Sequence, residues 1–189
     1  GFLAFVGITA GLFSSCSFSS FTDEEIRTAA AELIEASVAI NEIYFGEGLP
    51  SVEEDSDAAD AFSSEIQTDT TLLSYLPVSE DAGYTSIDGI KEATEKVYSQ
   101  SYCEYLFEMA FSGISTDNAE ATYARYLETD SGTLAVHKEL SVMDARTYDT
   151  KVDNIEVQRK SGNTAIVEAQ SYVNGEEDVT VEVQIIYED

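Results

Sequence analysis

Two side chains of this sequence have the chemistry of a catalytic base or a nucleophile: the single histidine, His137, and the thiol of Cys103. A histidine acts as a general base or a metal ligand when it lies in a pocket beside a carboxylate partner. His137 follows an apolar segment near the end of a predicted strand, and we expect it at the surface or at the strand edge. Glu104 and Glu108 disfavour a reactive thiolate at Cys103, which we expect to be a small buried residue. We therefore predict no catalytic residue.

The acidic residues do not have the spacing of a metal site. Asp55, Asp57 and Asp60 resemble the start of a calcium-binding loop, but Asp60 is displaced from the alternate position and no glycine follows. One histidine and one cysteine cannot supply the ligands of a structural zinc site. The motifs of nucleotide-binding loops, zinc proteases and serine hydrolases are absent from the sequence. The sequence therefore predicts neither a metal nor a cofactor.

Tyrosines form the remaining group with possible chemistry. The helical spacing of Tyr98, Tyr102 and Tyr105 favours ordinary packing in the core and at its edge. The fold family that the chain resembles, named below, implies a cavity between helices and a sheet, and the candidates to line it are Tyr98, Tyr102, Tyr105, Met109 and Tyr187. An isomerase-like site would need a buried carboxylic acid beside one of these tyrosines.

The first 16 residues have the features of an export signal. Residues 1–13 carry no charge and are too short for a permanent membrane-spanning helix, but they have the length of the apolar region of a signal peptide. Phe13, Ser14, Ser15 and Cys16 then resemble the bacterial lipobox, which implies lipidation at Cys16. We expect residues 1–16 to be a signal peptide that lacks its basic start, and residues 17–21 to be a tether. A signal cleaved without lipidation and a buried helix are the alternatives.

Composition excludes several classes of partner. The 189 residues include 37 Asp and Glu against nine Lys and Arg, which gives a net charge of −28. Binding to nucleic acid or to anionic lipid requires clustered basic residues, so neither is an expected partner. Hydrophobic residues make up 43% of the chain, which is enough for a folded core. We expect one domain over residues 22–189, with a solvated acidic surface.

Helical patterns come first along this domain. Thr22 and Glu25 have the spacing of a capping box, and the apolar residues that follow predict a helix over 22–45. Residues 51–70 are acidic and polar, and we expect a loop with at most one weak helical turn. Ser86 has the position of a cap for a second helical stretch, which continues to Gly113 with a break near 99–101.

Strand patterns follow from about Tyr123. Turn sequences at 160–163 and at Asn174–Gly175 separate alternating segments, and residues 179–187 have the clearest alternation of apolar and polar residues. Helices followed by such a series predict an α+β fold with helices packed on one face of a curved antiparallel sheet. No closing cap follows Tyr187, and we expect the sequence to be truncated at both ends.

This order of elements resembles the nuclear-transport-factor-two-like, or cystatin-like, α+β superfamily. The segments 75–78, 84–91, 97–99 and 102–106 are similar to the middle of exported proteins of Gram-positive bacteria in the D,L-endopeptidase inhibitor family, and 126–134 and 155–157 fit the same family. The resemblance covers residues 22–189. It implies an exported binding module that restrains a peptidoglycan hydrolase.

Three functions are compatible with these patterns. The first is a lipid-anchored protein on the extracellular face of the bacterial cytoplasmic membrane that binds an exported, basic cell-wall hydrolase, with the loop 51–70 entering its cleft. The second is a carrier of a small ligand, and the third is an isomerase or dehydratase that uses the same cavity. We favour the first, because a strongly acidic module attracts a basic partner.

Overall fold

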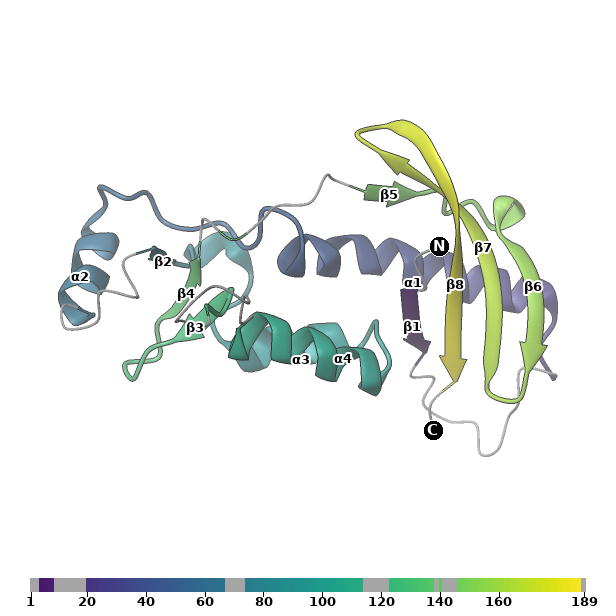
Figure 1. The fold of residues 1–189 in the computed structure, drawn as a ribbon, viewed down its shortest axis with the longest axis horizontal. Helices are drawn as coiled ribbons and strands as arrows, with labels where there is room; N and C mark the ends of the chain where they lie inside the picture. Colours follow the sequence, from purple (N-terminus) through teal and green to yellow (C-terminus); the bar gives the residue numbers. More distant parts are fainter. Residues whose placement is uncertain are drawn as a thin grey trace, which may run out of the picture. The chain divides into compact units, whose positions relative to one another are not determined.

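The computed structural model describes residues 4–8, 20–66, 74–113, 123–137, 140 and 146–187. It confirms the expected α+β class. The chain is organised in two compact units, each built from separate stretches of sequence. Unit 1 contains Gly1–Asn41, Ala93–Cys103 and Asp144–Asp189, and unit 2 contains Glu42–Glu92 and Glu104–Met143. Figure 1 shows the elements of both units.

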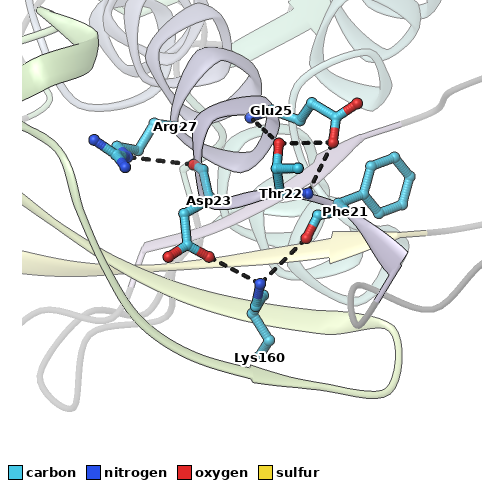
Figure 2. Close-up of polar contacts among 6 residues, drawn as sticks. All are labelled: Phe21, Thr22, Asp23, Glu25, Arg27 and Lys160. Atoms are coloured by element: carbon cyan, nitrogen blue, oxygen red, sulfur yellow. Dashed lines mark hydrogen bonds and ion pairs between the residues drawn. The ribbon is translucent and has the colours of Figure 1, made fainter.

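Helix α1 begins at the predicted place and spans Asp23–Tyr44. The Thr22 hydroxyl accepts a hydrogen bond from the Glu25 N–H at 3.2 Å, and the Glu25 carboxylate accepts one from the Thr22 N–H at 2.8 Å. This reciprocal pair satisfies two N–H groups that have no partner within the helix. Figure 2 shows this capping box with the Lys160 ammonium beside it. Ile26, Ala30 and Ile34 form the buried stripe of the helix, at the spacing expected for an amphipathic helix.

The larger sheet belongs to unit 1 and has the strand order β1-β8-β7-β5, with β6 also paired to β7. Its strands are β1 (Ala4–Ile8), β5 (Arg146–Tyr148), β6 (Glu156–Ser161), β7 (Thr164–Val173) and β8 (Glu176–Tyr187). All pairs are antiparallel except the parallel pair of β1 with β8. Asn174 and Gly175 both have positive φ, at 51° and 84°, which confirms the predicted tight turn between β7 and β8.

One face of this sheet is buried. Val167 and Ala169 on β7 share that face with Val183 and Val181 on β8, because the register places them opposite one another. A bulge between Gln170 and Tyr172 interrupts the pairing, and such bulges bend a strand. Figure 1 shows the bend in β7 and β8. The buried stripe of α1 lies in the same compact unit, so the core of unit 1 forms between this helix and the sheet.

Unit 2 contains a second, smaller sheet, which the sequence did not predict. Strands β2 (Tyr75–Pro77), β4 (Leu134–His137) and β3 (Tyr126–Glu128) form it in this order, with antiparallel pairing throughout. The expectation of one continuous sheet is wrong, because β4 pairs with β3 and with β2, which precedes β4 by about 60 residues in the sequence. Alternation shows that a segment is a strand, but it does not show which strand becomes its partner.

The remaining elements are short. Helix α2 spans Asp57–Glu65, α3 spans Ile87–Glu95 and α4 spans Gln100–Phe107, followed by the π-helical turn η4 (Glu108–Ser112). Two 3₁₀ turns are η3 (Glu80–Ala82) and η5 (Val152–Asn154). The Ser86 hydroxyl accepts a hydrogen bond from the Gly89 N–H at 3.1 Å, as its predicted capping position requires. The first strand expected after residue 120 begins at Tyr126 rather than at Tyr123.

Candidate interaction surface

The structure brings together two of the five residues predicted to line a cavity. Tyr98, between α3 and α4, is buried, and its ring lies 4.9 Å from the ring of Tyr102 in an edge-to-face arrangement. The Tyr98 hydroxyl donates a hydrogen bond to the Asn41 amide oxygen at 2.5 Å. Burial, and then the neighbouring Tyr102, raise the pKa of the Tyr98 phenol, so it stays protonated at neutral pH. These contacts are those of a well-packed core position.

The other three predicted residues lie in different surroundings. Tyr105 on α4 is exposed, with 56% of its surface accessible, and Met109 in η4 is half-buried. Tyr187 is buried at the end of β8, where its ring lies 6.4 Å from the ring of Phe21. The buried side of α4 and η4 is formed by Cys103, Leu106 and Ala110, one position away from the stripe that the tyrosines suggested.

The two candidate chemical groups are both buried. Cys103 is 2% exposed, which confirms the expected buried thiol, whereas the predicted lipidation site Cys16 lies outside the described residues. The expectation of a surface position for His137 is wrong. His137 ends the central strand β4 and is covered by neighbours on both sides, with the rings of Tyr75 and Tyr123 at 4.8 and 5.7 Å.

The carboxylates of the described residues do not have the environment of a catalytic acid. None of them is buried, and those whose pKa shifts, Asp23, Glu25, Glu65 and Asp149, all shift downwards. A general acid needs a raised pKa. Within the same residues, no group of three or more His, Cys, Asp and Glu side chains is placed to hold a metal ion. No helix in the described part of the chain has the length and apolar character needed to cross a bilayer.

The acidic segment expected to be a loop contains a folded helix, α2. The Ser56 hydroxyl accepts a hydrogen bond from the Ala59 N–H at 3.2 Å and caps the helix. Asp57 and Asp60 lie in its first turn, where negative charge interacts favourably with the helix dipole. The expectation of a loop with one weak turn is therefore wrong over residues 57–65. The spacing of Ala59, Phe62 and Ile66 after a serine cap is the sequence signal that could have shown it.

Helix α2 is fixed to the small sheet through a compact hydrophobic cluster. Phe62 and Ile66 pack with Tyr75 of β2 and Ala135 of β4, and the partly buried Leu127 of β3 completes the cluster. Phe62 is 3% exposed. A nine-residue helix is not stable alone in water, so this packing is what holds α2 in place.

Glu65 makes a second connection between α2 and the small sheet. Its carboxylate accepts hydrogen bonds from Ser131 and Thr129 in the turn between β3 and β4, which hold the pKa of Glu65 below its usual value. The interaction favours the charged carboxylate, so Glu65 remains ionised at neutral pH.

Exposed carboxylates are frequent on α2 and in the segment that leads into it, and we call this group the acidic ridge. It consists of six residues that are all exposed: Glu53, Glu54, Asp55, Asp57, Asp60 and Glu65. No Lys or Arg occurs between residues 28 and 90, so the ridge has no basic neighbour along the sequence. Unit 2 as a whole has 20 acidic and three basic residues, against 17 and six in unit 1. The ridge is therefore the best-defined surface for a positively charged partner.

A basic side chain secures the start of the folded body in unit 1. The Lys160 ammonium lies 2.8 Å from an Asp23 carboxylate oxygen and donates to the Phe21 carbonyl at 3.2 Å (Figure 2). First the hydrogen bond and then the charge of Lys160 lower the pKa of Asp23. These contacts fix the position at which the chain enters α1.

No protein-family model, no curated protein and no solved structure matches this chain. Membership in the cystatin-like superfamily therefore stays a prediction from the sequence.

Proposed function

We propose that this chain is an exported, lipid-anchored interaction module that binds a positively charged partner through the acidic ridge. The observation that carries the proposal is that Asp57, Asp60 and Glu65 stand on a folded helix held by Phe62 and Ile66, with Glu53, Glu54 and Asp55 in the segment that leads directly into it. A fixed array of charges loses less conformational freedom on binding than a flexible one, so more of its electrostatic attraction contributes to affinity.

More specifically, we propose that the partner is a peptidoglycan D,L-endopeptidase of the cell wall and that binding inhibits this enzyme. The resemblance of residues 22–189 to the D,L-endopeptidase inhibitor family supports this choice. The net charge of −28 also supports a basic partner, because opposite charges accelerate association at low salt. Lipidation at Cys16 would place the module on the outer face of the membrane.

The test is a titration of the protein into purified exported D,L-endopeptidases while peptidoglycan cleavage is followed. We expect saturable inhibition at a near-stoichiometric ratio, which weakens as salt concentration rises. A ridge variant, Glu53→Gln, Glu54→Gln and Asp55→Asn, removes three exposed charges, each worth about 0.2–1 kcal/mol at an exposed position. We therefore expect it to bind roughly three- to a hundredfold more weakly.

A control variant separates the ridge from overall charge. Asp153→Asn, Glu176→Gln and Glu177→Gln also remove three exposed negative charges, but from unit 1. If the ridge is the contact surface, this control weakens inhibition much less than the ridge variant. Equal losses in the two variants would show that net charge acts without a defined site, and no inhibition by the wild type would remove the hydrolase proposal.

A further inference from the structure

The edge of β8 has a partner that comes from the predicted export signal. Strand β1 pairs in parallel with the end of β8 over five residues, from Ala4 opposite Val183 to Ile8 opposite Tyr187. Figure 1 shows β1 beside β8 at the margin of the larger sheet. The apolar segment of the leader therefore acts as a strand of the folded unit.

The backbone groups of β8 show which side is covered. The Tyr187 N–H donates to the Asn163 carbonyl at 2.8 Å, towards β7. Backbone groups alternate between the two sides of a strand, so those of Gln184 and Ile186 face β1. Without β1, these groups would form an open sheet edge, which is a template for pairing with another chain.

The charges along β8 distinguish this part of the edge. Residues 183–187 carry no charge, whereas the preceding part of the strand contains four acidic residues, Glu176, Glu177, Asp178 and Glu182. Charged side chains are a common protection against unwanted strand pairing. Residues 183–187, where β1 pairs, form the longest uncharged run of the strand, which is expected of an edge that accepts a strand.

We infer that the β8 edge at Val183–Tyr187 accepts an extended, uncharged apolar segment of an exported partner protein, in the place that β1 holds before processing. This inference rests on the proposed removal of the leader. Peptides often bind by adding a strand to a sheet edge, with backbone hydrogen bonds and alternate side-chain positions as the recognition elements. A second copy is a less suitable occupant, because two copies with a net charge of −28 repel each other.

The experiment uses the full, unprocessed chain with Val6→Pro, which places a residue without an N–H in the middle of β1. The control is Ala10→Pro, which lies outside the paired residues. Hydrogen exchange followed by mass spectrometry reports the protection of residues 183–187. We expect faster exchange there in Val6→Pro than in the wild type or the control.

Binding is measured by fluorescence anisotropy with a labelled synthetic peptide that has the sequence of residues 2–9. We expect it to bind Val6→Pro at least about tenfold more tightly than the wild type, in which the tethered strand competes at millimolar effective concentration. It should also restore the protection of residues 183–187. A peptide with proline at the position of Val6 should not bind.

Several results would overturn the inference. Unchanged exchange in Val6→Pro would show that β1 does not cover the edge. An open edge that binds no peptide, or that binds the proline peptide equally well, would show that it does not accept a strand. A mature protein whose mass still includes residues 1–15 would show that the edge never opens. The exchange of residues 183–187, the binding of the peptide and the mass of the mature protein do not depend on hydrolase inhibition. If these three measurements give the expected results and inhibition fails, only the proposed partner is refuted.

Discussion

Removal of the Phe62 ring should detach α2 from the small sheet. Phe62 is 3% exposed and belongs to the cluster with Ile66, Tyr75 and Ala135. Truncation of a buried phenylalanine to alanine costs about 3–5 kcal/mol. Because α2 is too short to persist alone, this loss should appear as local opening of the helix.

The assay is hydrogen exchange by mass spectrometry on wild type and Phe62→Ala under identical conditions. At about 1.4 kcal/mol for each factor of ten, the expected acceleration over residues 57–66 is about a hundredfold to a few thousandfold. The β7–β8 hairpin, which belongs to unit 1, serves as the internal reference and should change much less. Tyr105→Ala is the control variant, because it removes an aromatic ring that is 56% exposed.

An acceleration over residues 57–66 of less than about threefold, or ~0.7 kcal/mol, would refute the reasoning. It would mean that contacts other than the Phe62 cluster hold the helix. If the helix does open, inhibition of the endopeptidase should weaken as well, because the ridge then loses its fixed geometry.

Three further predictions concern charge and protonation. The stability conferred by Glu65 is present above its unfolded pKa and is lost as pH falls through its lowered folded pKa. The cluster around Phe62 should therefore loosen in acid, and the acid-induced change in tyrosine fluorescence should be larger in the wild type than in Glu65→Gln. Lys160→Met should lower the melting temperature, and the difference from wild type should shrink in 1 M salt or once Asp23 is protonated at low pH. Tyr98→Phe leaves the Asn41 amide oxygen without this donor and should cost about 1–3 kcal/mol in urea denaturation. The raised pKa of Tyr98 also predicts that wild type loses stability above about pH 10, where the unfolded phenol ionises first, and that Tyr98→Phe loses less.

Local patterns in the sequence predicted local structure well. Thr22 and Glu25 identified the start of α1, and Asn174–Gly175 identified the turn of the long hairpin, because each depends on hydrogen bonds or dihedral angles within a few residues. The α+β class followed from the order of such elements. Partners distant in the sequence could not be obtained in this way. The choice of β2 as the partner of β4 depends on which apolar faces pack against one another. The alternation of residues within a single strand does not show this.

For the candidate surface, too, features of the sequence itself were predicted, whereas the packing that positions them was not. The charges of the acidic ridge were evident from the sequence, but the helix that carries Asp57, Asp60 and Glu65 was missed, because the density of Asp and Ser outweighed the apolar spacing of Phe62 and Ile66. His137 was misplaced for a related reason. Its burial comes from Tyr75 and Tyr123, which are far from it in the sequence.

Each of the two units is built from stretches that are far apart in the sequence, and this has a consequence for biosynthesis. Helix α1 is synthesised before β7 and β8 of its unit, and β7 begins about 120 residues after the helix ends. Unit 1 therefore cannot close around its core until these strands have been made, and long-range contacts of this kind form slowly. The proposed export would benefit from this delay, because a chain passes through a narrow secretion channel before it folds.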